Sequence, residues 1–344
     1  MSDVVCTIRN KTGIITLNRP EKINALTHEM IEEITKTLNS WKNDEQIELV
    51  LLEGAGPKGF CAGGDMKFYY DNRDQALTIA KKFFPTEYEM DLQIIQYPKP
   101  VVAFLDGIVM GGGVGISYGA DYKIVTEKTK WAMPEVNIGF FPDVGASFFL
   151  NQIPAPMARY ISLLGKVLRV DDVCYLGYAT HKIQRDDLDL VKEELINSNA
   201  PANPTEIEDL LVKYSEPPLD GYLKEHEQKI EQYFDYSDID MITEALKKGA
   251  DEGDAWAQET LQTLQEKSVF SQMIVLEQLE KAKEYSIEQC FDLELNLSYN
   301  FMENPDFFEG LRSVLVEKDQ PDWHYKTSKD VPKELIEKYL TYRP

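Results

Sequence analysis

The chain has 344 residues, of which 43% are hydrophobic and 28% charged, so it can form one large globular domain or two smaller ones. Its 36 lysines and arginines against 59 aspartates and glutamates give a formal net charge of −23. This excess of acid disfavours nucleic acid and anionic membranes as partners, because phosphate-rich surfaces bind clustered cations. It does not exclude a small anionic ligand, which needs only a local cluster.

The four cysteines and four histidines are scattered along the chain. Their spacing matches no zinc motif, so we expect no metal site. Scattered cysteines are typical of reduced thiols in the cytosol. The first residues also lack the basic and apolar segments of a signal peptide, and we therefore expect a cytoplasmic protein.

The first half of the chain alternates between strand-like and helix-like segments. Residues 4–8 and 13–17 flank an Asn-Lys-Thr-Gly sequence and predict a β-hairpin. Residues 25–41 carry apolar side chains at helical spacing and predict an amphipathic helix. Residues 49–52 and 101–105 are continuous apolar runs, typical of strands covered on both faces.

One longer apolar stretch, residues 100–117, is nearly long enough to span a bilayer. Asp106 and several glycines interrupt it. A buried strand that runs into a loop is therefore the favoured interpretation.

Farther along, residues 122–126 and 130–133 predict two more strands. Residues 147–164 predict a helix. Pro154 and Pro156 should divide it, because proline lacks the backbone N–H that continues a helix.

From about residue 191 the sequence becomes turn-rich and then mostly helix-forming and acidic. Residues 256–265 and 271–284 are the clearest helices. We therefore expect an α/β core over residues 1–197 and a mainly helical carboxy-terminal region over residues 198–344.

Three glycine-bearing segments follow predicted strands, at residues 59–65, 106–115 and 133–145. Glycine lets backbone N–H groups approach a ligand closely, and at a helix N-terminus these donors are unpaired. Two such N–H groups from separate loops can hold a developing oxyanion. A tight turn is the simpler interpretation of any one cluster, but two clusters and a carboxylate-bearing segment modestly favour a site.

The third segment carries Glu135 and Asp143, each preceded by proline and accompanied by apolar residues. Such surroundings can raise the pKa of a carboxylic acid and make it a base near neutral pH. Each acid also has a simpler role, Asp143 as the cap of a helix that starts near Gly145 and Glu135 as a solvated acid. Residue chemistry alone slightly favours the simpler roles.

Two known motifs overlap the second segment. Residues 113–119 fit a loose dinucleotide pattern, but a strand resumes before a Rossmann helix could continue, so we reject it. Gly115, Ser117 and Gly119 match the G-x-S-x-G nucleophile elbow. The preceding strand ends near residue 105, so we interpret Ser117 as a small helical packing residue and keep a serine esterase as a weaker alternative.

Together the segments resemble the enoyl-CoA hydratase/isomerase, or crotonase, superfamily. The matching motifs are Asn18-Arg19-Pro20 with Asn24-Ala25-Leu26, Phe60-Cys61-Ala62-Gly63-Gly64-Asp65, Gly111-Gly112-Gly113, and Asp306-Phe307-Phe308-Glu309-Gly310. The resemblance covers residues 4–325. It implies an α/β fold, a crotonase-like spiral of ββα units with a helical carboxy-terminal region, in which Gly64 and Gly112 donate to the oxyanion.

Within the superfamily, the sequence resembles the branch of the 3-hydroxyisobutyryl-CoA hydrolases. Hydratases place a second catalytic glutamate where this chain has Gly115, so one of the two acids that hydration needs is missing. The resemblance makes Glu135 the catalytic glutamate, lets Asp143 bind the acyl hydroxyl and gives Glu87 a further substrate contact. The segment 192–215 does not obviously follow the family pattern.

The resemblance therefore implies hydrolysis of 3-hydroxyisobutyryl-CoA, or a close 3-hydroxyacyl-CoA, to the free acid and CoA, as in valine catabolism. No cofactor is expected, because CoA is part of the substrate. An enoyl-CoA hydratase or isomerase and a non-catalytic scaffold stay as alternatives. Relatives commonly form trimers or dimers of trimers, so a homo-oligomer is consistent with the resemblance, although the sequence does not fix the state.

Overall fold

The computed structural model describes residues 2–344. The chain forms two compact units, and each unit consists of separate stretches of sequence. Unit 1 comprises Met1–Gly64, Thr86–Ala132 and Leu168–Glu225, and unit 2 comprises Asp65–Pro85, Met133–Val167 and His226–Pro344. The predicted boundary after residue 197 follows a change in composition, whereas the compact units follow packing, so the two divisions describe different properties of the chain.

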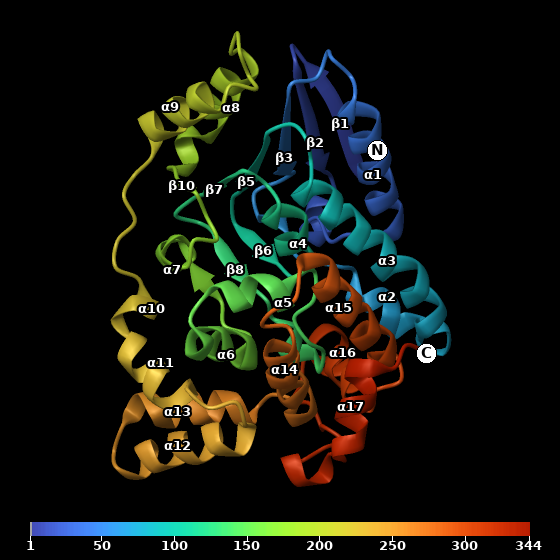
Figure 1. Ribbon diagram of the computed structural model, residues 1–344, viewed down its shortest axis with the longest axis vertical. Coiled ribbons are helices and arrows are strands. Elements are labelled where there is room, and N and C mark those ends of the chain that lie inside the picture. Colours follow the sequence, from blue (N-terminus) through green and yellow to red (C-terminus); the bar gives the residue numbers. More distant parts are fainter. Residues whose placement is uncertain (1) are drawn as a thin grey trace. The chain divides into compact units, whose positions relative to one another are not determined.

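The ten strands found within residues 2–344 all belong to unit 1 and form two sheets (Figure 1). The larger sheet has the order β1-β2-β3-β5-β7-β10 and the smaller has the order β4-β6-β8-β9. The bounds are β1 (Val4–Arg9), β2 (Thr12–Leu17), β3 (Leu49–Gly54), β4 (Gly59–Cys61), β5 (Val101–Leu105), β6 (Ile108–Met110), β7 (Tyr122–Val125), β8 (Lys130–Ala132), β9 (Leu168–Arg169) and β10 (His181–Lys182).

The larger sheet confirms the predicted hairpin and the predicted apolar strands. β1 and β2 pair antiparallel, and Asn10 at their turn has a φ of 51°, which asparagine tolerates better than most residues. From β2 onward the neighbouring strands run parallel. Both faces of these strands are covered, which explains their continuous apolar runs.

Of the strands in the smaller sheet, only β8 was predicted, as residues 130–133. Parts of the first two glycine-bearing segments were interpreted as loops, but they form β4 and β6, which pair in parallel. Strands of three residues are too short for periodicity to reveal. Their close approach requires glycine, since a Cβ atom on Gly59 would lie 2.4 Å from the backbone nitrogen of Ile108.

The helical segments of unit 1 alternate with its strands, and α3 (Ala76–Ile95) contributes to both units. Those of unit 1 are η1 (Pro20–Lys22), α1 (His28–Lys42), α4 (Gly112–Tyr118), α7 (Val170–Tyr175), η5 (Arg185–Asp187), α8 (Leu188–Ile196), α9 (Pro204–Tyr214) and α10 (Tyr222–Glu225). The segment 192–215, which the family pattern left open, supplies part of α8 and all of α9. These helices pack buried Val191, Leu195 and Leu211 against Leu51 and Phe104 of the larger sheet.

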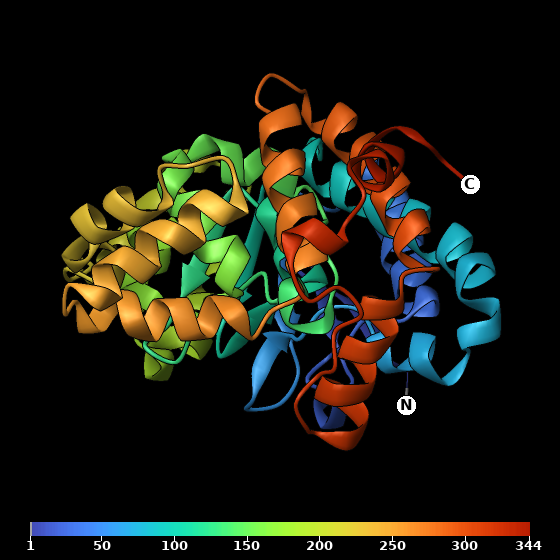
Figure 2. The same ribbon diagram turned by 90° about the horizontal axis from the view of Figure 1, so that it is seen from below.

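Unit 2 is built from helical segments. They are α2 (Met66–Asp71), η2 (Arg73–Gln75), η3 (Glu135–Ile138), α5 (Ala146–Phe149), η4 (Leu150–Gln152), α6 (Ala155–Leu164), α11 (Glu227–Phe234), α12 (Ile239–Asp251), α13 (Ala255–Gln265), α14 (Val269–Lys281), α15 (Ile287–Phe301), α16 (Pro305–Leu311), the π-helix η6 (Arg312–Glu317), η7 (Ser328–Asp330) and α17 (Lys333–Thr341). The orange pair α12 and α13 lies side by side in Figures 1 and 2, as does the pair α15 and α17 in Figure 1.

The predicted helices are confirmed with shifted ends. The first helix starts at His28 because the Thr27 side chain accepts a hydrogen bond from the Met30 N–H at 3.3 Å and caps it. The helix predicted over residues 147–164 is divided into α5, η4 and α6, with Pro154 as the N-cap of α6. Within residues 2–344 no helix has the length and apolar character that a bilayer crossing needs. The apolar stretch 100–117 instead forms β5, β6 and most of α4.

Candidate active site

In unit 1 two backbone segments bring Gly64 and Gly112 close together. Gly64 forms a β-bridge with Leu26, whose N–H donates to the Gly63 carbonyl oxygen at 2.8 Å. Gly112 is the first residue of α4, directly after the N-cap Gly111. A Cβ atom on Gly112 would lie 3.4 Å from the backbone nitrogen of Gly64. Two backbone N–H groups from separate segments are therefore neighbours, as an oxyanion hole requires.

Glycine is needed at several points of these two segments. Gly63 has a φ of 100°, a backbone conformation that residues other than glycine rarely adopt. A Cβ atom on Gly113 would lie 2.5 Å from the carbonyl oxygen of Cys61. The two segments can lie this close only without side chains at these positions.

Glu87 lies beside the second glycine segment. It belongs to α3, is only 2% exposed, and its Oε1 would be 2.5 Å from a Cβ atom on Gly112. Asp91, one turn farther along α3, is 0% exposed and was not singled out in the sequence. Burial raises the pKa of the nearby Cys61 thiol to about 12, and the carboxylates of Glu87 and Asp91 contribute to the increase. The structure thus brings Gly64, Gly112 and Glu87 together.

In unit 2 the structure brings Glu135 and Asp143 together. Glu135 opens η3 and is 8% exposed, and Asp143 precedes α5 and is 6% exposed. Burial raises the pKa of Glu135 well above its ordinary value, and the Asp143 and Glu294 carboxylates raise it further. Among residues 2–344, no hydrogen bond to Glu135 Oε2 is formed. The interpretation of Glu135 as a solvated acid is therefore wrong.

Asp143 is not the N-cap residue of α5. The N-cap of α5 is Gly145, and no side chain caps this helix through the N-cap position. Asp143 contributes its backbone carbonyl oxygen, which accepts from the Ala146 N–H at 3.0 Å. Glu294 of α15 instead accepts hydrogen bonds from the backbone N–H groups of Gly145 and Ser147, at the start of α5.

Sequence reasoning missed Glu294. This acid is 0% exposed, and burial raises its pKa to about 8, while the two backbone hydrogen bonds oppose the increase. Its position was a usable signal, because it lies among the buried residues Cys290, Leu293 and Leu297 of one helix. A carboxylate is rarely buried unless hydrogen bonds or a charge partner compensate it.

The family motif at residues 306–310 supports the short helix that carries Glu135. A Cβ atom on Gly310 would lie 2.2 Å from the backbone carbonyl carbon of Ile138, the last residue of η3. Gly139 follows with a φ of 66°, and a Cβ atom there would lie 2.4 Å from the Asp306 carbonyl oxygen. The backbone of α16 therefore lies directly against η3, the short helix that carries Glu135.

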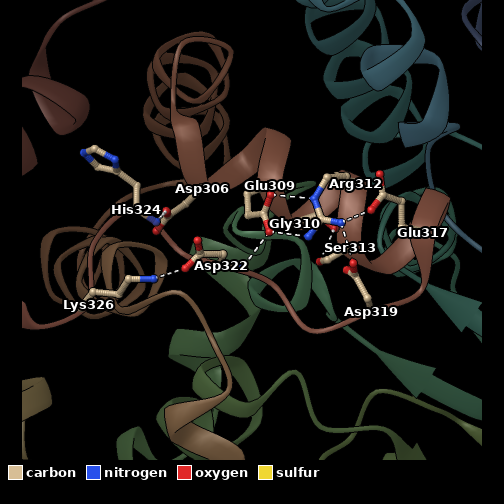
Figure 3. A network of polar contacts seen from close by, with 10 residues as sticks. All are labelled: Asp306, Glu309, Gly310, Arg312, Ser313, Glu317, Asp319, Asp322, His324 and Lys326. Atoms are coloured by element: carbon tan, nitrogen blue, oxygen red, sulfur yellow. Dashed lines mark hydrogen bonds and ion pairs between the residues drawn. The ribbon is translucent and has the colours of Figure 1, made fainter.

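Polar contacts also fix the side chains of Asp306 and Glu309 in this motif (Figure 3). Asp306 accepts from the backbone N–H of His324 at 2.6 Å. Arg312 donates to both carboxylate oxygens of Glu309, at 2.8 and 2.6 Å, and to Asp319 at 2.8 Å. These contacts hold the chain after α16 around the guanidinium group of Arg312.

The two motifs that overlap the second glycine segment do not form the sites they suggest. Ser117 is buried in α4, and its Oγ donates to the carbonyl oxygen of Gly113 at 2.8 Å. It does not follow a strand directly, so a nucleophile elbow is excluded. The helix ends at Tyr118 and β7 starts at Tyr122, which confirms that residues 113–119 do not open a Rossmann helix.

Known proteins are similar to this chain in both sequence and fold. Residues 12–340 match the enoyl-CoA hydratase/isomerase family. The 3-hydroxyisobutyryl-CoA hydrolase, mitochondrial, of Danio rerio is 36% identical and aligns over 98% of this chain and 89% of its own length. The protein of the same name from Homo sapiens is 35% identical over 96% of this chain and 86% of its own length.

Two solved structures superpose on almost the whole chain. The carnitinyl-CoA dehydratase from Mycobacterium thermoresistibile has a TM-score of 0.92 and 32% identity, covering 99% of this chain and 96% of that one. The enoyl-CoA hydratase from Rhodobacter sphaeroides 2.4.1 has a TM-score of 0.89 and 29% identity, covering 99% and 97%. The predicted α/β crotonase fold with a helical carboxy-terminal region is thereby confirmed. The chain belongs to the enoyl-CoA hydratase/isomerase family.

Proposed function

We propose that the protein hydrolyses the thioester of 3-hydroxyisobutyryl-CoA, or of a close 3-hydroxyacyl-CoA, to the free acid and CoA. The single observation that carries the proposal is the buried pair Glu135 and Asp143 in a chain with Gly115 at the second acid position of hydratases. One buried acid with a raised pKa suffices for thioester hydrolysis, whereas adding water across a double bond uses two in this family. Relatives named 3-hydroxyisobutyryl-CoA hydrolase support the same assignment.

In the proposed reaction the thioester carbonyl oxygen accepts hydrogen bonds from the backbone N–H groups of Gly64 and Gly112. Negative charge grows on this oxygen as the carbonyl carbon becomes tetrahedral. Fixed donors stabilise that charge without reorganising, and loss of one donor costs about 10²–10³ in rate in known sites. The neighbouring positions of Gly64 and Gly112 in unit 1 support this role.

Glu135 supplies the other half of the reaction in one of two ways. As a general base, its carboxylate takes a proton from water, the water oxygen bonds to the carbonyl carbon, and the C–S bond breaks to release CoA thiolate, which takes up the proton. As a nucleophile, its carboxylate bonds to the carbonyl carbon and expels the thiolate, and water then cleaves the mixed anhydride. The Oε2 atom, which no other described residue binds, suits both routes.

Asp143 and Glu87 are proposed to recognise the acyl group. Asp143 accepts a hydrogen bond from the acyl hydroxyl, and Glu87 helps to orient it. A buried site built to bind a hydroxyl can reject the analogue that lacks it by ~10⁴ or more, because its polar groups are then left unpaired. We therefore expect a strong preference for 3-hydroxyacyl-CoA over the matching unsubstituted acyl-CoA.

A hydratase or dehydratase is the second candidate, and it is favoured by the two superposed structures, which are a dehydratase and a hydratase. Such an enzyme forms or removes a double bond and releases no free thiol. Gly115 argues against this chemistry, because it lies buried in α4 and has no side chain to move a proton.

The proposal has a direct test in Glu135→Gln, which preserves size and hydrogen bonding but cannot act as a base. We expect the release of CoA thiol from 3-hydroxyisobutyryl-CoA to fall by about 10²–10⁴, measured with a thiol reagent. Ser117→Ala is the control, because it should leave thiol release near the wild-type rate. Near-normal thioesterase activity of Glu135→Gln would refute the assignment.

The remaining assignments belong to the same proposal. The reaction needs no metal or added cofactor, and CoA enters only as part of the substrate. Valine catabolism, a cytoplasmic location and a homo-oligomeric state stay predictions; the relatives named above carry the word mitochondrial.

A further inference from the structure

Two buried polar side chains of unit 2 bind the backbone on either side of Asp143. The first is Gln278 of α14, which is 1% exposed. Its Nε2 donates to the carbonyl oxygen of Pro142 at 2.7 Å and to Oγ of Ser147 at 2.8 Å. This amide therefore holds the residue directly before Asp143.

The second side chain is Glu294 of α15. Its Oε2 accepts from the Gly145 N–H at 2.7 Å, and its Oε1 accepts from the Ser147 N–H at 2.8 Å. Both oxygens are thus bound to the turn that follows Asp143. Only a carboxylate offers two acceptor oxygens in this geometry, since glutamine would present an NH₂ group to one of the two donors.

The turn itself needs support. Val144 has a φ of 54° and Gly145 a φ of 88°, so two consecutive residues adopt left-handed conformations. This conformation is unfavourable for a β-branched residue such as valine. Strained backbone of this kind persists only where the surrounding structure holds it in place, and it is frequent at functional sites.

We propose that Gln278 and Glu294 are positioning residues that fix the Asp143 carboxylate and thereby set the preference for an acyl group with a 3-hydroxyl. The inference rests on the proposed function, because it assigns these residues to hydroxyl recognition by Asp143. Neither residue contacts substrate in this account. Both act through the backbone from Pro142 to Ser147.

The charge arrangement supports the same role. Burying a carboxylate is unfavourable, and the nearby Asp143 carboxylate adds repulsion that raises the Glu294 pKa further. Mere packing of α15 would be served better by an apolar side chain. An acid at this position is explained by the two N–H groups of the turn, which donate to both of its oxygens and oppose the increase in its pKa.

The test compares Glu294→Gln with Leu293→Ala, a buried substitution on the same helix that serves as the control for lost stability. The first readout is the ratio of kcat/KM for 3-hydroxyisobutyryl-CoA to that for isobutyryl-CoA, which lacks only the hydroxyl. The second is hydrogen exchange of the peptide that contains residues 143–147. For Glu294→Gln we expect the ratio to fall at least tenfold and the exchange to accelerate at least tenfold. Leu293→Ala should lower Tm but leave both the kcat/KM ratio and the hydrogen exchange unchanged.

Unchanged exchange in Glu294→Gln would overturn the inference, because the turn would not depend on the carboxylate. Accelerated exchange with an unchanged kcat/KM ratio would also overturn it, since Glu294 would then stabilise the turn without serving recognition. If wild-type protein released no thiol from 3-hydroxyisobutyryl-CoA, the proposed function would fail, and hydrogen exchange would still decide whether Glu294 holds the turn.

Discussion

Single residues decide which proton transfers are available near neutral pH. Glu135, Asp143 and Glu294 are all buried in unit 2, and each carboxylate makes ionisation of a neighbour less favourable. A glutamate in ordinary solution titrates near ~4.3 and is a weak base at pH 7. Burial and like charge move Glu135 towards the range in which a general base is most effective.

This arrangement predicts how activity depends on pH. Glu135 must be ionised to act as base or nucleophile, and its pKa is raised, so kcat/KM should fall with acidification well above pH ~4.3. The measurement is a pH profile of thiol release. Asp143→Asn, assayed with isobutyryl-CoA, should shift the acid limb to lower pH, because a negative neighbour of Glu135 is removed. A profile that is flat down to pH ~5 would contradict this account.

A second prediction concerns Gly112, which we propose as a donor to the oxyanion. A methyl group there would lie 2.5 Å from Oε1 of Glu87, so Gly112→Ala must displace either the side chain or the N–H donor. We expect kcat to fall by about 10²–10³ while the far-UV circular dichroism spectrum is retained. An unchanged kcat would show that Gly112 does not hold the oxyanion.

Among the elements, the short helix η3 depends on a glycine far away in sequence. Gly310 of α16 leaves room for the backbone of Ile138, where a Cβ atom would approach to 2.2 Å. Gly310→Ala should therefore displace η3 and with it Glu135. We expect a lower Tm and a loss of kcat larger than the loss of stability explains, measured by thermal unfolding and thiol release.

The matched control for Gly310→Ala is Gly253→Ala in the same unit. Gly253 has a φ of 94° and no atom within 4 Å of its Cβ position, so alanine there adds backbone strain without a clash. It should lower Tm and leave kcat unchanged. Equal kcat in both variants would show that α16 does not position Glu135.

The sequence allowed the longer elements to be predicted, because apolar periodicity and proline breaks act locally. Residues 4–17 formed the expected hairpin, and residues 147–164 were divided as expected. Strands β4, β6 and β9 of the smaller sheet were missed because they have only two or three residues, and β4 and β6 are fixed by a close contact at Gly59. Such contacts join residues far apart in sequence and leave no periodic signal.

The candidate site was predictable only in part for the same reason. The family motifs indicated Gly64, Gly112, Glu87, Glu135 and Asp143, and the structure brings the first three together in unit 1 and the last two together in unit 2. Residue chemistry alone misjudged Glu135, because α16, which packs against its helix η3, lies far away in sequence. Gln278 and Glu294 were missed, since their partners lie more than a hundred residues away in sequence.

For the whole molecule, membership of the enoyl-CoA hydratase/isomerase family leaves several reactions open, because one fold hosts many chemistries. The superposed dehydratase and hydratase and the hydrolase relatives share the frame of this chain. What separates these reactions is the number of buried acids and the fate of the thioester bond. The oligomeric state can be measured by light scattering, but it affects neither the number of buried acids nor the fate of the thioester bond.

The most direct measurement is the release of free CoA thiol from 3-hydroxyisobutyryl-CoA, with crotonyl-CoA as the parallel substrate. We predict rapid thiol release from the first and neither thiol release nor hydration of the second. Hydration of crotonyl-CoA without thiol release would contradict the account, because a chain with Gly115 in place of the second acid would then add water across a double bond.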